Sequence, residues 1–126
     1  MKRILYILIA AVVLVVCSYS LSGSNDETSL DINQAIGLGQ CERIAEYLAP
    51  DVLLVMQGKE TTCSKGQVEQ VLCEFFKQNK PAQFLCPAGR GLVSGTFVSR
   101  AGRSYKLEYT LQTIDNKDVI TGFYVY

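Results

Sequence analysis

The chain has 126 residues, with 12 Lys and Arg against 12 Asp and Glu, no His and no Trp. This length fits one domain of ordinary size. The balanced charge argues against nucleic acid as the main partner, because phosphate binding needs a net basic face. The absence of His removes the most frequent acid–base group near neutral pH and the most frequent metal ligand, so no cofactor and no metal are expected.

Residues 1–22 have the pattern of a signal peptide or a lipoprotein signal. Lys2 and Arg3 precede an uncharged apolar run over 4–16, which is shorter than the roughly 20 residues needed to span a membrane. Three outcomes stay open: ordinary cleavage, lipidation of Cys17, or an uncleaved anchor. Val16 departs from the lipoprotein pattern, in which the residue before the Cys is small. Each outcome exports the protein.

The mature chain is predicted to consist of a flexible linker over 23–30 and one domain over 31–126. The linker prediction follows from a polar segment without periodicity. Apolar residues at helical spacing then predict two helical pieces between Leu30 and Leu48. The pieces bend at Gly37–Gly39 and end at Ala49–Pro50, because glycine and proline both disfavour a continuous helix.

A capping box predicts the next helix, over 64–79. Ser64 is followed three residues later by Gln67, so each side chain can satisfy a free backbone N–H at the helix start. The apolar stripe behind it comprises Val68, Val71, Leu72, Phe75 and Phe76. Before this helix, the apolar run 52–56 predicts a strand covered on both faces, followed by a turn at 57–60.

The apolar period changes to two after residue 82, which predicts strands. Residues 105–111 alternate between an apolar row (Tyr105, Leu107, Tyr109 and Leu111) and a polar row that includes Glu108. Together with strands at 92–98 and 119–126, and a short one at 83–86, this forms an antiparallel meander. Helices first and strands last indicate a segregated α+β fold.

These residues carry a family resemblance. The element order over 31–126 resembles the cone-shaped nuclear transport factor 2-like (cystatin-like) superfamily. More narrowly, Gly58-Lys59-Glu60, Ser64-Lys65 with Gln67, and Phe75-Phe76 resemble an uncharacterised domain-of-unknown-function family of exported Bacteroidetes proteins. The resemblance implies a curved antiparallel sheet packed on helices, with an apolar pocket at the open end. It also implies that a bacterium exports the protein, to the periplasm, to the cell surface or, as a lipoprotein, to the outer membrane.

Four cysteines outside the signal are candidates for two disulfides, since an even number in an exported domain favours pairing. Cys73 lies about 140° from the apolar stripe of its helix, toward solvent. Cys63 and Cys73 are separated by about 15 Å of helix, which excludes their pairing. Two connectivities remain: Cys41–Cys63 with Cys73–Cys86, which we favour, or Cys41–Cys73 with Cys63–Cys86. Cys41 equally fits a small core residue.

The inward row Tyr105, Tyr109 and Leu111 is the candidate pocket lining. A catalytic use of the tyrosines would need a facing carboxylate, and only Asp51 fits that position. The sequence therefore favours a non-catalytic, exported cell-envelope binding or interaction domain over the alternative, a small isomerase or hydratase that uses these tyrosines. The expected partners are a small apolar ligand or a protein, including a second copy bound through the sheet; the membrane is expected only at the N-terminus.

Overall fold

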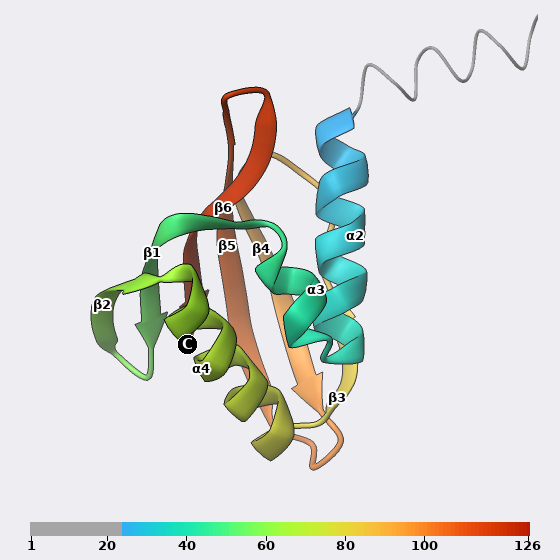
Figure 1. Cartoon of the computed structure of the whole chain (residues 1–126). Coiled ribbons are helices and arrows are strands. Elements are labelled where there is room, and N and C mark those ends of the chain that lie inside the picture. The colour runs from blue at the N-terminus through green and yellow to red at the C-terminus, as the bar shows by residue number, and fades with distance from the viewer. Residues whose placement is uncertain (1–23) are drawn as a thin grey trace, which may run out of the picture.

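The computed structural model describes residues 24–126, which form one curved six-stranded sheet with three helices on one of its faces (Figure 1). The helices are α2 (Ser24–Leu38), α3 (Cys41–Ala45) and α4 (Lys65–Gln78). The strands are β1 (Leu48–Met56), β2 (Lys59–Ser64), β3 (Pro81–Leu85), β4 (Gly91–Ser99), β5 (Ser104–Ile114) and β6 (Lys117–Val125). This confirms the predicted α+β class. The predicted signal and Cys17 lie outside the described residues.

The strand order in the sheet is β2-β1-β6-β5-β4-β3. The predicted meander β3–β4–β5–β6 is antiparallel throughout, whereas β1 pairs with β6 in parallel. The last strand of the chain therefore lies in the middle of the sheet. We call the face covered by the helices the inner face and the opposite one the outer face.

Helix α4 forms as its sequence predicts. Ser64 accepts a hydrogen bond from the Gln67 N–H, and the Gln67 side chain accepts one from the Ser64 N–H, which completes the capping box. Phe75 and Phe76 turn toward the sheet, where the Phe75 ring lies 5.6 Å from that of Phe97 and 5.4 Å from that of Tyr105. These rings fill one end of the core, since edge-on and tilted aromatic contacts at this spacing are favourable.

Helices α2 and α3 meet at the predicted bend. Gly39 has φ +69°, and a Cβ there would lie 3.0 Å from the Pro81 side chain, so glycine suits both the turn and the close approach. The prediction that the second piece extends to Ala49–Pro50 is wrong. Helix α3 ends at Ala45. Strand β1 begins at Leu48, and both Leu48 and Ala49 are buried in the core.

The prediction of a flexible linker over 23–30 is wrong for residues 24–30, which lie in a helix. Helix α2 begins at Ser24, and Ser29 is fully buried against the sheet. Polar composition suggested a spacer, but a small polar side chain can enter a core when it finds a hydrogen-bond partner. Among the described residues, no helix is long and apolar enough to cross a membrane.

The chain between α3 and α4 is a β-hairpin, of which only the first strand was predicted. Gln57 and Gly58 both have positive φ, as a two-residue hairpin turn requires. Strand β2 has no buried side chain, so it carries no apolar pattern. Strand β1 is also not covered on both faces, because Leu53 and Val55 point to the outer face and are half-buried.

The disulfide pairing that we favoured is wrong. Cys41 is bonded to Cys73, with their Cα atoms 5.1 Å apart, and Cys63 and Cys86 are free. The short helix α3 lies against α4, which brings Cys41 to the solvent side of α4 where Cys73 was predicted. Cys63 lies in β2, opposite Val52 of β1, and packs against the core. Cys86 follows β3, and its carbonyl oxygen accepts a hydrogen bond from Asn33 of α2.

We expect Cys73→Ala to lower the free energy of unfolding by about 3–4 kcal/mol, because the bond closes a loop between residues 32 apart and restricts the unfolded chain. Urea unfolding of the oxidised protein measures this loss. Cys63→Ala, which removes a free thiol, is the control and should cost markedly less. Alkylation of Cys73 without reductant, at the rate of Cys63, would contradict the bond.

Candidate functional site

The candidate pocket residues lie on the inner face, and the structure buries most of them. Tyr109 is fully buried and Leu111 is 4% exposed. Tyr105 is half-buried at the C-terminal end of α4, where its hydroxyl donates to Asn79 Oδ1 over 3.0 Å. Tyr109 and Leu111 therefore fill the interior of the domain, and Tyr105 closes one end of it.

The Tyr109 hydroxyl is the centre of a buried hydrogen-bond network. It lies 2.7 Å from both Ser29 Oγ and Asn33 Oδ1. The Asn33 side-chain nitrogen donates to the Cys86 carbonyl oxygen, and the Gly89 N–H donates to Ser29 Oγ. One consistent proton arrangement follows: Tyr109 donates to Asn33 and accepts from Ser29. The network joins α2, the middle of β5 and the loop after β3.

Burial keeps the titratable groups of this network neutral. Desolvation raises the pKa of the Tyr109 hydroxyl far above its ordinary value, and the hydrogen bond with Ser29 lowers it only in part. Desolvation likewise raises the pKa of the Cys86 thiol to about 11, against a smaller lowering by Asn33. Near neutral pH the network therefore holds a phenol and a thiol, the less nucleophilic forms of both groups.

The acid–base pair required by the isomerase or hydratase alternative does not assemble. Asp51, the one carboxylate predicted to face the tyrosines, is exposed, because β1 is irregular between Leu48 and Leu53 and leaves both Pro50 and Asp51 in solvent. The hydrogen-bond partners of the Tyr109 and Tyr105 hydroxyls in the described part of the chain are Ser29, Asn33 and Asn79, none of which titrates.

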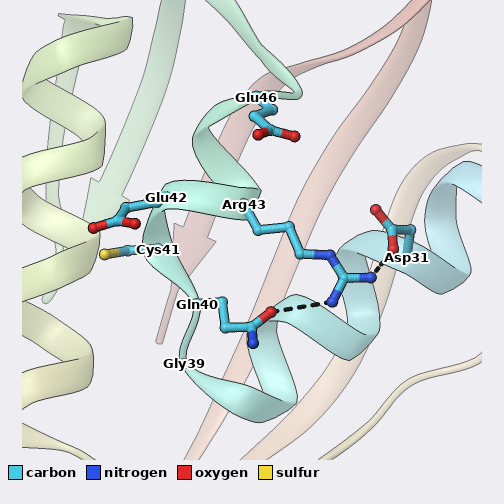
Figure 2. A pocket seen from close by; sticks show the side chains of 7 residues that line it. All are labelled: Asp31, Gly39, Gln40, Cys41, Glu42, Arg43 and Glu46. Atoms are coloured by element: carbon cyan, nitrogen blue, oxygen red, sulfur yellow. Dashed lines mark hydrogen bonds and ion pairs between the residues drawn. The ribbon is translucent and has the colours of Figure 1, made fainter.

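Hollows open to solvent lie on the helical side of the molecule. A hollow of about 620 Å³ lies where α2, the bend and α3 meet, and Figure 2 shows the side chains that line it. Arg43 spans it, forming an ion pair with Asp31 and donating to Gln40 and Gln34. Gly39 is the sequence signal for this hollow, because its positive φ follows the end of α2 and turns the chain into α3.

The outer face of the sheet is the second accessible feature. Leu53 and Val55 of β1 adjoin Tyr124 of β6, whose ring lies over Gly122; a Cβ at position 122 would collide with the Tyr124 hydroxyl. That hydroxyl lies 3.1 Å from Thr110 Oγ1. Glu108, predicted on the solvated face, is only 8% exposed, because it lies between its neighbours on this crowded face.

Metal binding has no support in the described residues. His is absent from the whole chain, and residues 24–126 contain no group of three or more Cys, Asp or Glu side chains placed to hold a metal ion.

The fold defines the class of protein. A curved sheet packed on helices is the architecture of the cone-shaped nuclear transport factor 2-like and cystatin-like proteins. An uncharacterised cystatin-fold protein from Novosphingobium aromaticivorans is similar in structure, with a TM-score of 0.56, 12% identity, and coverage of 81% of this chain and 97% of that one.

Within this class, the chain belongs to the family described as Domain of unknown function (DUF4783), which residues 29–122 match. Similar crystal structures of this family come from Bacteroides fragilis and Bacteroides ovatus. Each has a TM-score of 0.70 and covers 75% of this chain, with 22% and 24% identity over 93% and 90% of their own lengths, respectively. No curated protein matches the chain.

We expect Tyr109→Phe to lower the free energy of unfolding at pH 7 by about 1–3 kcal/mol, because Ser29 and Asn33 lose a buried partner. The wild type has a raised folded-state pKa at Tyr109, so this group's contribution is complete below the unfolded pKa of about 10 and is lost as the pH rises further. Between about pH 9 and 11, a range that brackets the unfolded pKa of tyrosine, the free energy of unfolding should therefore fall less in the variant than in the wild type.

Urea unfolding at pH 7, 9 and about 11, the range that brackets the unfolded phenol pKa, measures both effects. Tyr105→Phe is the matched control, because the Tyr105 hydroxyl is half-buried and has one partner at the edge of the core. An equal decrease in the free energy of unfolding in the two variants at pH 7 would contradict a particular contribution of the Tyr109 network to stability.

Proposed function

We propose that this protein is exported to the bacterial cell envelope and acts there by binding a partner, without catalysing a reaction. The observation that carries the proposal is that the interior of the domain is filled by side chains whose polar groups are already hydrogen-bonded. Tyr109, the group best placed for acid–base chemistry, is buried, neutral and fully engaged with Ser29 and Asn33. Recognition is therefore assigned to the surfaces, namely the helical side and the outer face of the sheet.

Export is supported by the N-terminal pattern and by the disulfide. Residues 4–16 form the apolar run of a signal, and the pair Cys41–Cys73 is a bond that persists mainly in oxidising compartments.

We further propose that the outer face binds a second copy of the chain. Six strands about 4.8 Å apart and roughly nine residues long give a face of about 25 by 30 Å. This is about 750 Å², close to the area per partner of a stable interface. Leu53, Val55 and Tyr124 supply apolar area on β1 and β6, and Leu92, which is 61% exposed, lies on the same face of β4, opposite Thr110 of β5.

Export is tested by fusing a reporter enzyme that is active only outside the cytoplasm to the C-terminus. The wild-type chain should give activity, and Leu8→Arg should abolish most of it, because a charge interrupts the apolar run that the export machinery recognises. Intact mass spectrometry of the wild type and Cys17→Ala separates the two processing routes, since only a lipidated chain carries a lipid adduct that the variant lacks. Equal activity in the wild type and Leu8→Arg would refute export by this segment.

Dimerisation is tested by sedimentation equilibrium of the purified protein. We expect a mass of twice the chain for the wild type, and at least tenfold weaker association for Leu92→Glu, since each copy would bury an unpaired carboxylate. Leu38→Glu, at a residue 59% exposed on α2, is the control and should leave association unchanged. A wild type that stays monomeric at roughly 100 µM, where a contact of about 5.5 kcal/mol would form, contradicts the interface.

A further inference from the structure

Glu108 lies in the middle of a row of side chains that crosses the outer face of the sheet. In the strand register, Glu108 is opposite Ser94 of β4 and Tyr124 of β6. Tyr124 in turn is beside Val55 of β1. The strand order makes β5 and β6 the two central strands of the sheet, and Glu108 is near the middle of β5. The pair Glu108 and Tyr124 therefore lies near the centre of the outer face.

The carboxylate of Glu108 is buried without a hydrogen bond. The residue is 8% exposed, and its charged contact within residues 24–126 is the ammonium group of Lys106, with 3.9 Å between Nζ and Oε1. This separation is longer than a hydrogen bond, and no other group in the described part of the chain donates to the carboxylate. Buried carboxylates normally accept hydrogen bonds, because an unpaired charge away from water is costly. Glu108 therefore has acceptor capacity that the chain itself does not use.

A donor from outside the chain can reach this carboxylate. Every fully enclosed side-chain oxygen among the described residues has a hydrogen-bond partner, so the oxygens of Glu108, which have none, keep a narrow opening to the outer face. Lys106 precedes Glu108 by two positions on β5, so it lies on the same face roughly 7 Å away. The Lys106 side chain is 64% exposed. Its ammonium group can therefore turn toward a second carboxylate that approaches this face.

We propose that, in the dimer formed through the outer face, Lys106 of each copy pairs with Glu108 of the other. In a dimer with two-fold symmetry, residues near the axis meet the same residues of the second copy. An interface that covers the whole outer face has its axis near the centre of that face, where Glu108 lies. The inference rests on the proposed dimerisation, and it adds the contact that completes the site at Glu108.

The reciprocal pair determines which surface can cover the outer face. Two Glu108 carboxylates that meet near the axis repel each other unless a cation lies between them, and covering either one without a cation leaves a buried charge unpaired. The second copy brings its own Lys106 to this position, whereas an apolar surface of an unrelated protein does not. Charge complementarity at the centre therefore favours a second copy as the occupant.

The test is a charge swap followed by sedimentation equilibrium. Lys106→Glu leaves only carboxylates near the axis and Glu108→Lys leaves only ammonium groups, so each variant alone should associate at least about tenfold more weakly than the wild type. An equimolar mixture of the two should associate, because each carboxylate then faces an ammonium group of the other chain. Pairing within one chain predicts the opposite, since each of these chains carries two like charges.

A second, milder pair of variants keeps the test decisive if Glu108→Lys does not fold, which circular dichroism shows. Lys106→Gln changes an exposed side chain and leaves Glu108 of the second copy without its cation, so it should weaken association. Adding Glu108→Gln to the same chain should recover most of the loss, because the carboxylate that lacked a partner is then gone.

The control variants are Lys65→Glu and Glu46→Lys, which make the same changes in net charge at exposed positions on the helical side. Alone or mixed, they should associate like the wild type. A swap mixture of folded variants that associates no better than its components, or Lys106→Gln that associates like the wild type, would overturn the reciprocal pair. If Leu92→Glu still weakens association in that case, the dimer stands and only this inference fails; a monomeric wild type refutes both.

Discussion

The buried hydroxyl of Tyr109 is the interaction on which the rest of this structure depends. It joins the first helix to the central part of the sheet through Ser29 and Asn33, and these in turn bind the backbone at Gly89 and Cys86. In an interior of low dielectric such a network is strong when complete and costly when one member is missing. It therefore fixes where α2 lies, and the position of α2 determines where the bend and α3 can lie.

The same network limits the chemistry that the interior of the domain can supply. A cone-shaped fold can leave space between sheet and helices, but here Tyr109 and the Phe75–Phe97 cluster occupy the interior. Groups that are buried, neutral and satisfied cannot exchange protons readily with a substrate. The surfaces accessible to solvent are the hollows beside the helices and the outer face of the sheet.

Local patterns in the sequence predicted the elements that depend on local physics. The capping box of α4 and the alternation along β5 were sufficient, because both report contacts within a few residues. Strand β2 was not predicted, since an exposed strand carries no apolar signal. The Cys41–Cys73 pair and the partners of Tyr109 depend on residues 32 and 80 positions apart, so they follow from packing and have no local signature. The polar character of Ser29 even suggested the opposite of its buried position.

The place of β6 has a consequence for how the chain acquires its shape. The final strand lies between β1 and β5, and even the terminal residue, Tyr126, exchanges backbone hydrogen bonds with Lys106. Strand β6 thus joins the β1–β2 hairpin to the part of the sheet formed by β3, β4 and β5. The parallel pairing of β1 with β6 joins residues about 70 positions apart, and contacts between such distant residues slow the folding of a domain.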